Sequence, residues 1–352
     1  MIKMHNTQCT GCTACFAICP TNAISMEPDE EGFLFPVIDE NCCINCHKCD
    51  DVCPLENPWK YEYQDYCYLA TSANNEELAY CSSGGVFPIL ARYTLNKSGI
   101  ICGCILDQDC TARHVVSDDP KVVRAMSKSK YVQSDMGDCY QQTKSLLDKG
   151  RFLLFSGTPC QVGGLMSYLG REYKNLLTMD FACHGVPSPL FFKKYVTNVK
   201  AKNPHVKSFW FRNKSRGWCQ SVSMTWLDED GNEIQRIANL EDSYLKEFIE
   251  NNSLRKSCPQ CHFCTPQRSS DFTVGDHWNM GKSPFYNPLG VSFILFNSQK
   301  ALHWLKENED EFQTLERISL KNVGQPHFWR PYFRGKNRKQ IFTALAEGKI
   351  CQ

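Results

Sequence analysis

The cysteines near the start of the chain have the types and spacing that iron–sulfur chemistry needs. Two runs repeat one pattern, in which cysteines are separated by two, two and three residues and a proline follows the last cysteine. Three closely spaced thiolates can wrap one face of a cubane, while the fourth thiolate reaches the neighbouring cluster. We therefore expect two 4Fe–4S clusters, one held by Cys9, Cys12, Cys15 and Cys53 and the other by Cys19, Cys43, Cys46 and Cys49.

Zinc is the main alternative for these two runs, because paired CxxC motifs also bind zinc. A zinc site uses four ligands, and two complete, duplicated runs with terminal prolines fit that requirement poorly. The spacing therefore favours clusters.

A third group of cysteines lies far downstream and supplies three corners of a further cubane. The fourth ligand must then come from elsewhere, and both Cys183 and Cys160 are candidates. The alternative is a structural zinc knuckle in which His262 would be a ligand. The three cysteines of this group are Cys258, Cys261 and Cys264.

Several glycine-rich or basic turns are candidates for anion binding. A Ser-Ser-Gly-Gly turn at residues 82–85 precedes an expected helix at 86–95, where backbone amides and the helix dipole favour phosphate. Two lysines lie in residues 127–134, and cations alternate with aromatics in residues 211–218, which would hold a flavin or a base or form a surface turn. The sequence contains neither GxGxxG after a strand nor a P-loop, so standard NAD(P)H and nucleoside-triphosphate sites lack support.

Composition limits the class of protein. The chain has 352 residues, 22 of them cysteine, and 39 basic residues against 38 acidic ones. This balance gives no support for a nucleic-acid partner. The first residues lack a signal-peptide pattern, and no apolar run approaches the roughly 20 residues of a membrane span. We expect a reduced, cytoplasmic protein whose cysteines serve metal or redox chemistry.

The motifs divide the chain into parts. Residues 1–58 are expected to form a dicluster ferredoxin-like domain, which takes much of its folding energy from metal. Residues 59–66 are expected to be a linker. Residues 67–150 and 151–352 are expected to be the two parts of one flavin- and iron–sulfur-binding body.

The body shows strands that alternate with helices, which predicts an α/β or α+β fold with helices packed on a sheet. A hairpin turn is expected at residues 230–231. Strands are expected at residues 99–106, 151–156, 175–181, 207–212, 221–234 and 291–296, and helices at 86–95, 162–169, 190–201 and 299–311.

The motifs occur in an order that resembles the coenzyme F420 hydrogenase/dehydrogenase beta-subunit family, over about residues 65 to 340. A dicluster module at the front is a common fusion in that family. His277 departs from a common pattern before the tryptophan of the last motif. The motifs lie at residues 82–85, 129–132, 157–161, 183–185, 258–264 and 275–278.

The resemblance implies a non-covalent FAD with at least one 4Fe–4S cluster beside it. The third cluster would have Cys258, Cys261 and Cys264 as ligands, with Cys183 as the fourth. The residues that would approach the FAD are Ser83, Gly84, Gly85, Lys128, Lys130 and Tyr131, while Thr158, Pro159 and Cys160 would lie near the isoalloxazine.

These features predict an iron–sulfur flavoprotein oxidoreductase that exchanges electrons with a ferredoxin or another redox partner. Its flavin would exchange hydride with a small organic substrate or a deazaflavin coenzyme. His184 is a candidate proton donor, although it would equally structure its turn. The alternatives are a non-catalytic electron-transfer subunit and a flavin-free nucleic-acid-binding protein. A homo-oligomer is compatible with the sequence.

Overall fold

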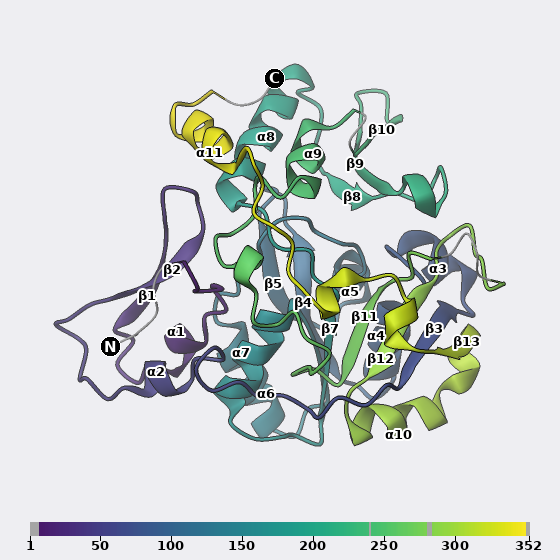
Figure 1. Cartoon of the computed structure of the whole chain (residues 1–352), viewed down its shortest axis with the longest axis horizontal. Helices are drawn as coiled ribbons and strands as arrows, with labels where there is room; N and C mark the ends of the chain where they lie inside the picture. Colours follow the sequence, from purple (N-terminus) through teal and green to yellow (C-terminus); the bar gives the residue numbers. More distant parts are fainter. Residues whose placement is uncertain (1–6, 239–240, 280–283, 350–352) are drawn as a thin grey trace.

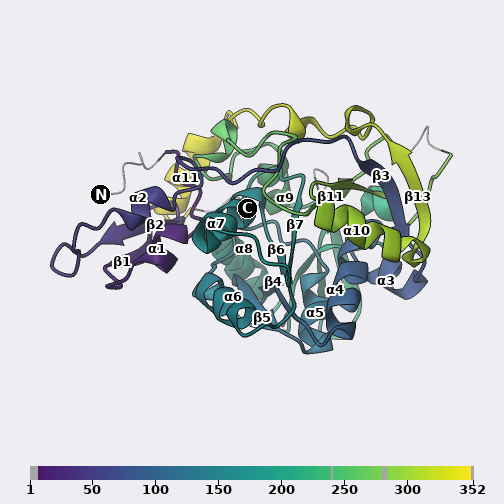
Figure 2. The ribbon, with the colours of Figure 1, turned by 90° about the horizontal axis from the view of Figure 1, so that it is seen from below.

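The computed structural model describes residues 7–238, 241–279 and 284–349. The N-terminal residues form a small module that projects from one side of a larger α/β body (Figure 1). The module and the edge strand β13 (Phe312–Ile318) lie at opposite ends of the molecule (Figure 2). Among the described residues, no helix is both long and apolar enough to cross a membrane.

The internal repeat of the module is visible in its backbone. Gly11 and Thr13 in the first run have φ of 69° and 68°, and Asn45 and His47 in the second have φ of 52° and 58°. The two cysteine runs therefore follow the same path. The module also contains two short helices and one antiparallel strand pair, namely α1 (Ala14–Ile18), α2 (Lys48–Asp51), β1 (Ile24–Pro28) and β2 (Leu34–Ile38).

The hairpin between β1 and β2 anchors the module in the body. Phe33 is buried in a core cluster of the body, with its ring 6.3 Å from that of Phe342. The Glu31 carboxylate accepts a hydrogen bond from Arg338 Nη1 at 2.8 Å. Gly32 has φ of 81°, and a Cβ added there would lie 2.3 Å from the Cβ of Leu190. The hairpin tip thus requires glycine to approach the body this closely.

An eight-stranded mixed sheet forms the centre of the body, in the order β13-β3-β12-β11-β7-β6-β4-β5. The pairs β4–β6, β6–β7 and β7–β11 are parallel, and the other pairs are antiparallel. It follows that β3, β4, β6, β7 and β11 run in one direction. The strands are β3 (Cys67–Ser72), β4 (Ile100–Leu106), β5 (Ala112–Ser117), β6 (Leu153–Ser156), β7 (Leu176–Phe181), β11 (Phe272–Asp276) and β12 (Ser292–Phe296).

Helices cover both faces of this sheet. On one face α4, α5 and α10 pack on inward-facing strand residues such as Ile101 and Leu154. On the other face α1, α6 and α7 pack on the alternate residues, such as Leu153 and Phe155. Burial on both faces explains why these strands are almost continuously apolar. The helices are α3 (Asn75–Tyr80), α4 (Val86–Asn96), α5 (Pro120–Met126), α6 (Cys139–Asp148), α7 (Pro159–Leu169) and α10 (Gln299–Glu307).

A smaller sheet packs beside the main one, in the order β10-β9-β8 (Figure 1). Its core contains Phe211 and Trp226 from the strands and Phe192 and Tyr244 from helices. The elements of this part are β8 (Trp210–Arg212), β9 (Val222–Leu227), β10 (Glu233–Ile237), α8 (Pro189–Lys202), α9 (Ser243–Ile249) and α11 (Arg338–Ala346).

The mixed α/β class predicted from the sequence is confirmed. Every predicted strand and helix of the body corresponds to an element of the same type, and the hairpin at residues 230–231 joins β9 to β10. The sequence did not indicate β3, β5, β11 or β13. Of these, β5 and β13 run antiparallel to their neighbours and, together with the predicted β12, make the sheet mixed.

Candidate functional site

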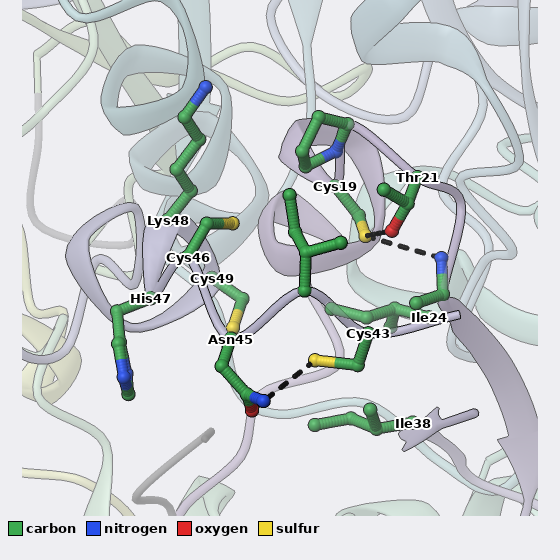
Figure 3. Close-up of a pocket in the computed structure, with 13 residues that line it drawn as sticks. Cys19, Thr21, Ile24, Ile38, Cys43, Asn45, Cys46, His47, Lys48 and Cys49 are labelled. Carbon is green, nitrogen blue, oxygen red and sulfur yellow. Dashed lines mark hydrogen bonds between the residues drawn. The ribbon is translucent and has the colours of Figure 1, made fainter. Parts of the chain in front are cut away.

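Four cysteines surround a small hollow at the outer side of the N-terminal module. Cys19 comes from the end of α1, and the other three come from the second run (Figure 3). The Cys19 sulfur accepts a hydrogen bond from the Ala23 amide at 3.2 Å. Cys46 is exposed, so this outer site faces solvent. The hollow is lined by Cys19, Cys43, Cys46 and Cys49, which are the residues expected to hold one cluster.

A second group of thiols lies inside, between the module and the body. Cys9, Cys15 and Cys53 are buried, and Cys12 is half-buried. Burial raises the pKa of Cys15 to about 12, and the neighbouring thiols of Cys9, Cys53 and Cys49 contribute to this rise. Burial also raises the pKa of Cys12, with Cys15 and Cys9 adding to the effect. The structure thus groups Cys53 of the second run with three cysteines of the first, as expected for the inner cluster.

A third group lies where α7 begins, and it contains five cysteines instead of four. Burial raises the pKa of Cys183, and the nearby thiols of Cys258, Cys160 and Cys261 add to it. The pKa of Cys261 is raised first by a hydrogen bond with Cys264 and then by burial. Both candidates for the fourth ligand, Cys183 and Cys160, therefore lie at this site. The Cys160 thiol also contributes to the raised pKa of Cys12, so Cys160 lies on the side of the third group that faces the inner group.

In residues 7–238, 241–279 and 284–349, no three His, Cys, Asp or Glu side chains converge as ligands of a single ion. The outer thiols instead lie around a hollow, an arrangement that suits a polynuclear cluster with separate corners.

A cavity of about 490 Å³ opens at the carboxyl ends of the parallel strands. Cys104 of β4, Ser156 of β6, Phe181 of β7 and Asp276 of β11 all line it. In open α/β sheets this edge is the usual place for ligands, and the volume lies in the range of small-molecule and cofactor pockets. Cys183 lines the cavity too, so the third cysteine group adjoins it.

One end of the cavity is built by the Ser-Ser-Gly-Gly turn before α4. Gly85 is the N-terminal cap of α4, with φ of 89°. Lys214 Nζ holds the turn by donating to the Ser83 carbonyl at 2.6 Å. The Ser83 hydroxyl oxygen is enclosed and has no hydrogen-bond partner in the described part of the chain. An orphaned hydroxyl beside a helix N-terminus is suited to an anionic ligand atom.

The two lysines expected at this end of the cavity differ in their side-chain contacts. Lys128 Nζ lies 5.4 Å from the ring centroid of Trp210, and burial lowers its pKa. Lys130 Nζ donates to the carbonyls of Cys104 and Ala125 at 2.6 and 2.5 Å, and burial lowers its pKa to about 8. Lys130 therefore braces the cavity wall, and Lys128 is the better placed cation.

A buried ion pair crosses the cavity between the two sheets. Arg212 is 5% exposed and donates to Asp276 Oδ2 at 3.0 Å, to the Tyr131 hydroxyl at 3.1 Å and to the Ser82 carbonyl at 2.9 Å. Trp218 Nε1 donates to the other Asp276 oxygen at 3.2 Å. Arg212 lies in the run for which a surface turn was an alternative, and its burial excludes that alternative for this residue.

A chain of hydrogen bonds lines the wall near the start of α7. His114 Nε2 lies 3.0 Å from the Ser156 carbonyl, which can only accept, so this nitrogen carries the proton. His114 Nδ1 then accepts from Ser134 Oγ, which accepts from Gln161 Nε2. Gln161 Oε1 closes the chain by accepting from the amide of Thr158. Burial lowers the pKa of His114 to about 4, so the imidazole is neutral at neutral pH.

His184 also lines the cavity, beside Cys183. Its Nε2 lies 2.7 Å from Asn251 Oδ1, and its ring centroid lies 4.0 Å from that of Tyr332 and 4.7 Å from that of Phe248. Burial lowers the pKa of His184 to about 4. These contacts hold the ring in one orientation, and its role as a proton donor stays a prediction.

Most residues expected near a flavin line this cavity, but three lie outside the lining. Gly84 packs behind the turn, where an added Cβ would be 2.3 Å from the Ala70 carbonyl oxygen. Pro159 begins α7, and Cys160 lies with the third cysteine group. The expected residues in the lining are Ser83, Gly85, Lys128, Lys130, Tyr131 and Thr158.

Sequence reasoning missed several residues around these sites. His114, Gln133 and Arg255 were not singled out as candidates, and no local spacing marks any of them. Their burial and partners depend on contacts between distant segments, such as His114 with Ser156 and Arg255 with Cys9. Gln161 was present in a recognised motif, but nothing local indicated its bond to Ser134.

Two family models match parts of this chain. Residues 8–57 match the 4Fe–4S dicluster domain. Residues 150–320 match the family that describes the C terminus of the beta subunit of coenzyme F420 hydrogenase/dehydrogenase. Among the curated proteins there is no match.

Among solved structures, a similar chain occurs in the F420-reducing NiFe hydrogenase complex from Methanosarcina barkeri. The identity is 15% and the TM-score 0.44, and the match covers 83% of this chain and 90% of that chain. By the two family matches, residues 8–57 are a 4Fe–4S dicluster domain and residues 150–320 belong to the coenzyme F420 hydrogenase/dehydrogenase beta-subunit family.

Proposed function

We propose that this chain is an iron–sulfur flavoprotein oxidoreductase. It exchanges electrons with a ferredoxin or another redox partner protein at the outer module and hydride with an organic substrate or deazaflavin coenzyme at an FAD in the cavity. The observation that carries the proposal is the continuous series from the exposed outer thiols to the cavity. The Cys49 thiol of the outer group contributes to the raised pKa of Cys15 in the inner group, and the Cys160 thiol contributes to the raised pKa of Cys12, so these groups are neighbours. Cys183 lines the cavity.

The donor sets fit the proposed clusters. Two groups of four thiols suit a dicluster domain. The last cysteine of the first run, Cys19, lies with three cysteines of the second run, and the last cysteine of the second run, Cys53, lies with those of the first. For a third 4Fe–4S cluster we propose Cys258, Cys261 and Cys264, with Cys183 as the fourth ligand because its thiol adjoins those of Cys258 and Cys261. Cys160 is the alternative fourth ligand.

The volume and the polar lining of the cavity support the proposal of a flavin dinucleotide. The orphaned Ser83 hydroxyl, the N-terminus of α4 and the Lys128 ammonium suit a pyrophosphate. Thr158 and the hydrogen-bond chain from Gln161 to His114 form a fixed polar wall at the far side. A bound flavin supplies the conversion between one-electron and two-electron chemistry that clusters lack.

The chain's own residues have separable tasks in this proposal. Lys214 and Arg212 fix the turn at residues 82–85 through its backbone carbonyls, so its amides are presented in one geometry. Gln161 orients Thr158 through both its amide and its hydroxyl. The aromatic rings of Phe248 and Tyr332 hold His184 and exclude water from that side.

The decisive measurement is cofactor content after anaerobic purification. Three cubanes and one FAD predict about twelve irons, about twelve acid-labile sulfides and one extractable flavin per chain. Ser83→Leu fills the space at the orphaned hydroxyl and should lose flavin while keeping iron, whereas Ser145→Leu on the exposed side of α6 should lose neither. About eight irons with zinc and no flavin would overturn the flavoprotein proposal.

The fourth ligand of the third cluster can be tested separately. Cys183→Ala should lower iron by about four per chain, and Cys160→Ala should leave it unchanged. The reverse result would assign Cys160 instead.

A non-catalytic electron-transfer subunit is the second candidate, because the matched family model is described as that of a beta subunit. A flavin-replete chain that forms a stable complex but shows no turnover alone, with deazaflavin or other hydride donors, would favour this candidate.

A further inference from the structure

Arg255 is fully buried between the module and the body. Its guanidinium makes three hydrogen bonds, from Nε to the Cys9 carbonyl at 2.8 Å, from Nη2 to the Leu34 carbonyl at 2.9 Å and from Nη1 to Gln133 Oε1 at 3.0 Å. It also lies 4.2 Å from the ring centroid of Phe35. All of these partners are neutral.

The lack of a counter-charge sets Arg255 apart from the other buried arginines. Arg212 and Arg338 pair with Asp276 and Glu31, and Arg268 lies 4.0 Å from Asp180. Within residues 7–238, 241–279 and 284–349, no carboxylate forms an ion pair with Arg255. A buried charge without an oppositely charged partner is costly, which points to an anion close to Arg255.

The position of Arg255 identifies that anion. The guanidinium abuts Gly11, where an added Cβ would lie 2.9 Å from Nη1, so it touches the loop between Cys9 and Cys12. On its other side, the Arg255 carbonyl accepts from the Cys258 amide at 3.0 Å. Its charge also reaches the thiols of Cys160 and Cys258. Arg255 thus stands between the inner and third cysteine groups.

We propose that Arg255 is a positioning residue that docks the module and raises the reduction potentials of the clusters on its two sides relative to the outer one. The inference rests on the proposed function, because it requires clusters at these sites. A cubane with four thiolates carries net negative charge, and nearby positive charge favours its reduced form. Electrons entering at the exposed outer cluster are therefore drawn inward.

The outer site provides an internal control. Its loop follows the same backbone path, but the residue that corresponds to Gly11 is Asn45, which is exposed. The side chain of Asn45 approaches Cys43, with its Oδ1 3.8 Å from the thiol. The outer cluster should therefore keep its potential when Arg255 is changed.

The test is a redox titration of the anaerobically purified full chain, followed by electron paramagnetic resonance. Arg255→Met should lower the reduction potentials of the inner and third clusters by about 59 mV or more, which is a tenfold change in the one-electron equilibrium constant. The reduction potential of the outer cluster should stay unchanged. Arg255→Lys should keep the inner and third potentials close to those of the wild type, because it keeps the positive charge. Equal potentials in wild type and Arg255→Met, or equal shifts in the Met and Lys variants, would overturn the proposal.

Gln133→Glu provides a second variant if Arg255→Met loses its clusters. It keeps the shape but places a carboxylate against the guanidinium, so it should lower the same two potentials, while Gln133→Met should not. If Gln133→Glu leaves them unchanged, the charge of Arg255 does not act on the clusters. Iron and sulfide assays distinguish a failure of the proposed function from a failure of this inference. A wild-type protein without clusters would refute the proposed function. A full set of clusters whose potentials do not change in the variants would refute only the inference about Arg255.

Discussion

The buried pair of Arg212 and Asp276 gives a sharp prediction about stability. Asp276→Asn removes the negative charge and leaves Arg212, which is 5% exposed, with neutral acceptors only: the Tyr131 hydroxyl, the Ser82 carbonyl and the one amide oxygen of the new side chain. Removing one partner of a buried pair costs about 3–5 kcal/mol. Because the Asp276 side chain is 18% exposed and neutral acceptors remain for Arg212, we expect about 3 kcal/mol, the lower end of that range.

The assay is urea unfolding followed by tryptophan fluorescence, to which Trp218 contributes from its contact with Asp276. Asp109→Asn, at an exposed aspartate, serves as the matched control. Arg212→Met combined with Asp276→Asn should be no less stable than Asp276→Asn alone, since no charge is then left unpaired. A change below about 0.5 kcal/mol for Asp276→Asn, or additive losses in the double variant, would refute the reasoning.

Three further predictions concern pH, ligands and partners. The folded pKa of His114 is about 4, below the ordinary 6.5, so its contribution to stability is present above pH 6.5 and lost as pH falls toward 4. Between about pH 7 and pH 5 wild type should lose about 2 kcal/mol more than His114→Gln in urea unfolding, and equal losses would contradict this. Cys43→Ala should remove about four irons per chain, whereas Cys42→Ala, at the adjacent exposed cysteine, should remove none by iron assay. Residues 7–58 contain nine acidic residues and one basic residue, so stopped-flow electron transfer to a basic carrier should slow as salt rises, and an acidic carrier showing the same trend would count against docking at the module.

The grouping of cysteines within each run could be inferred from the sequence because its determinants are local. Within each run the spacing fixes which thiols share a loop, and the positive φ values at Gly11 and Asn45 repeat that loop twice. The parallel strands β4, β6 and β7 were also predictable, because burial on both faces makes them continuous apolar runs.

The remaining parts of the fold depend on contacts between distant segments. Strand β3 pairs with β12 and β13, which lie more than 200 residues later in the chain. The polar partners of Arg255 come from three segments, around Cys9, Leu34 and Gln133. Neither arrangement has a local pattern, so only the tertiary structure identifies the sheet edge and the buried cation.

Helix α7 connects these sites physically, and its composition is explained by what it touches. It contains adjacent glycines at positions 163 and 164, each of which costs a helix interior about 1 kcal/mol relative to alanine. An added Cβ at Gly164 would lie 3.0 Å from the Cys12 sulfur, and one at Gly163 would lie 2.6 Å from the Phe263 ring. The same helix begins beside Thr158 in the cavity wall and carries Cys160 one residue inside its start. The glycines therefore allow the inner thiols and the loop at Cys261 to approach one helix from two sides, while its N-terminus borders the cavity.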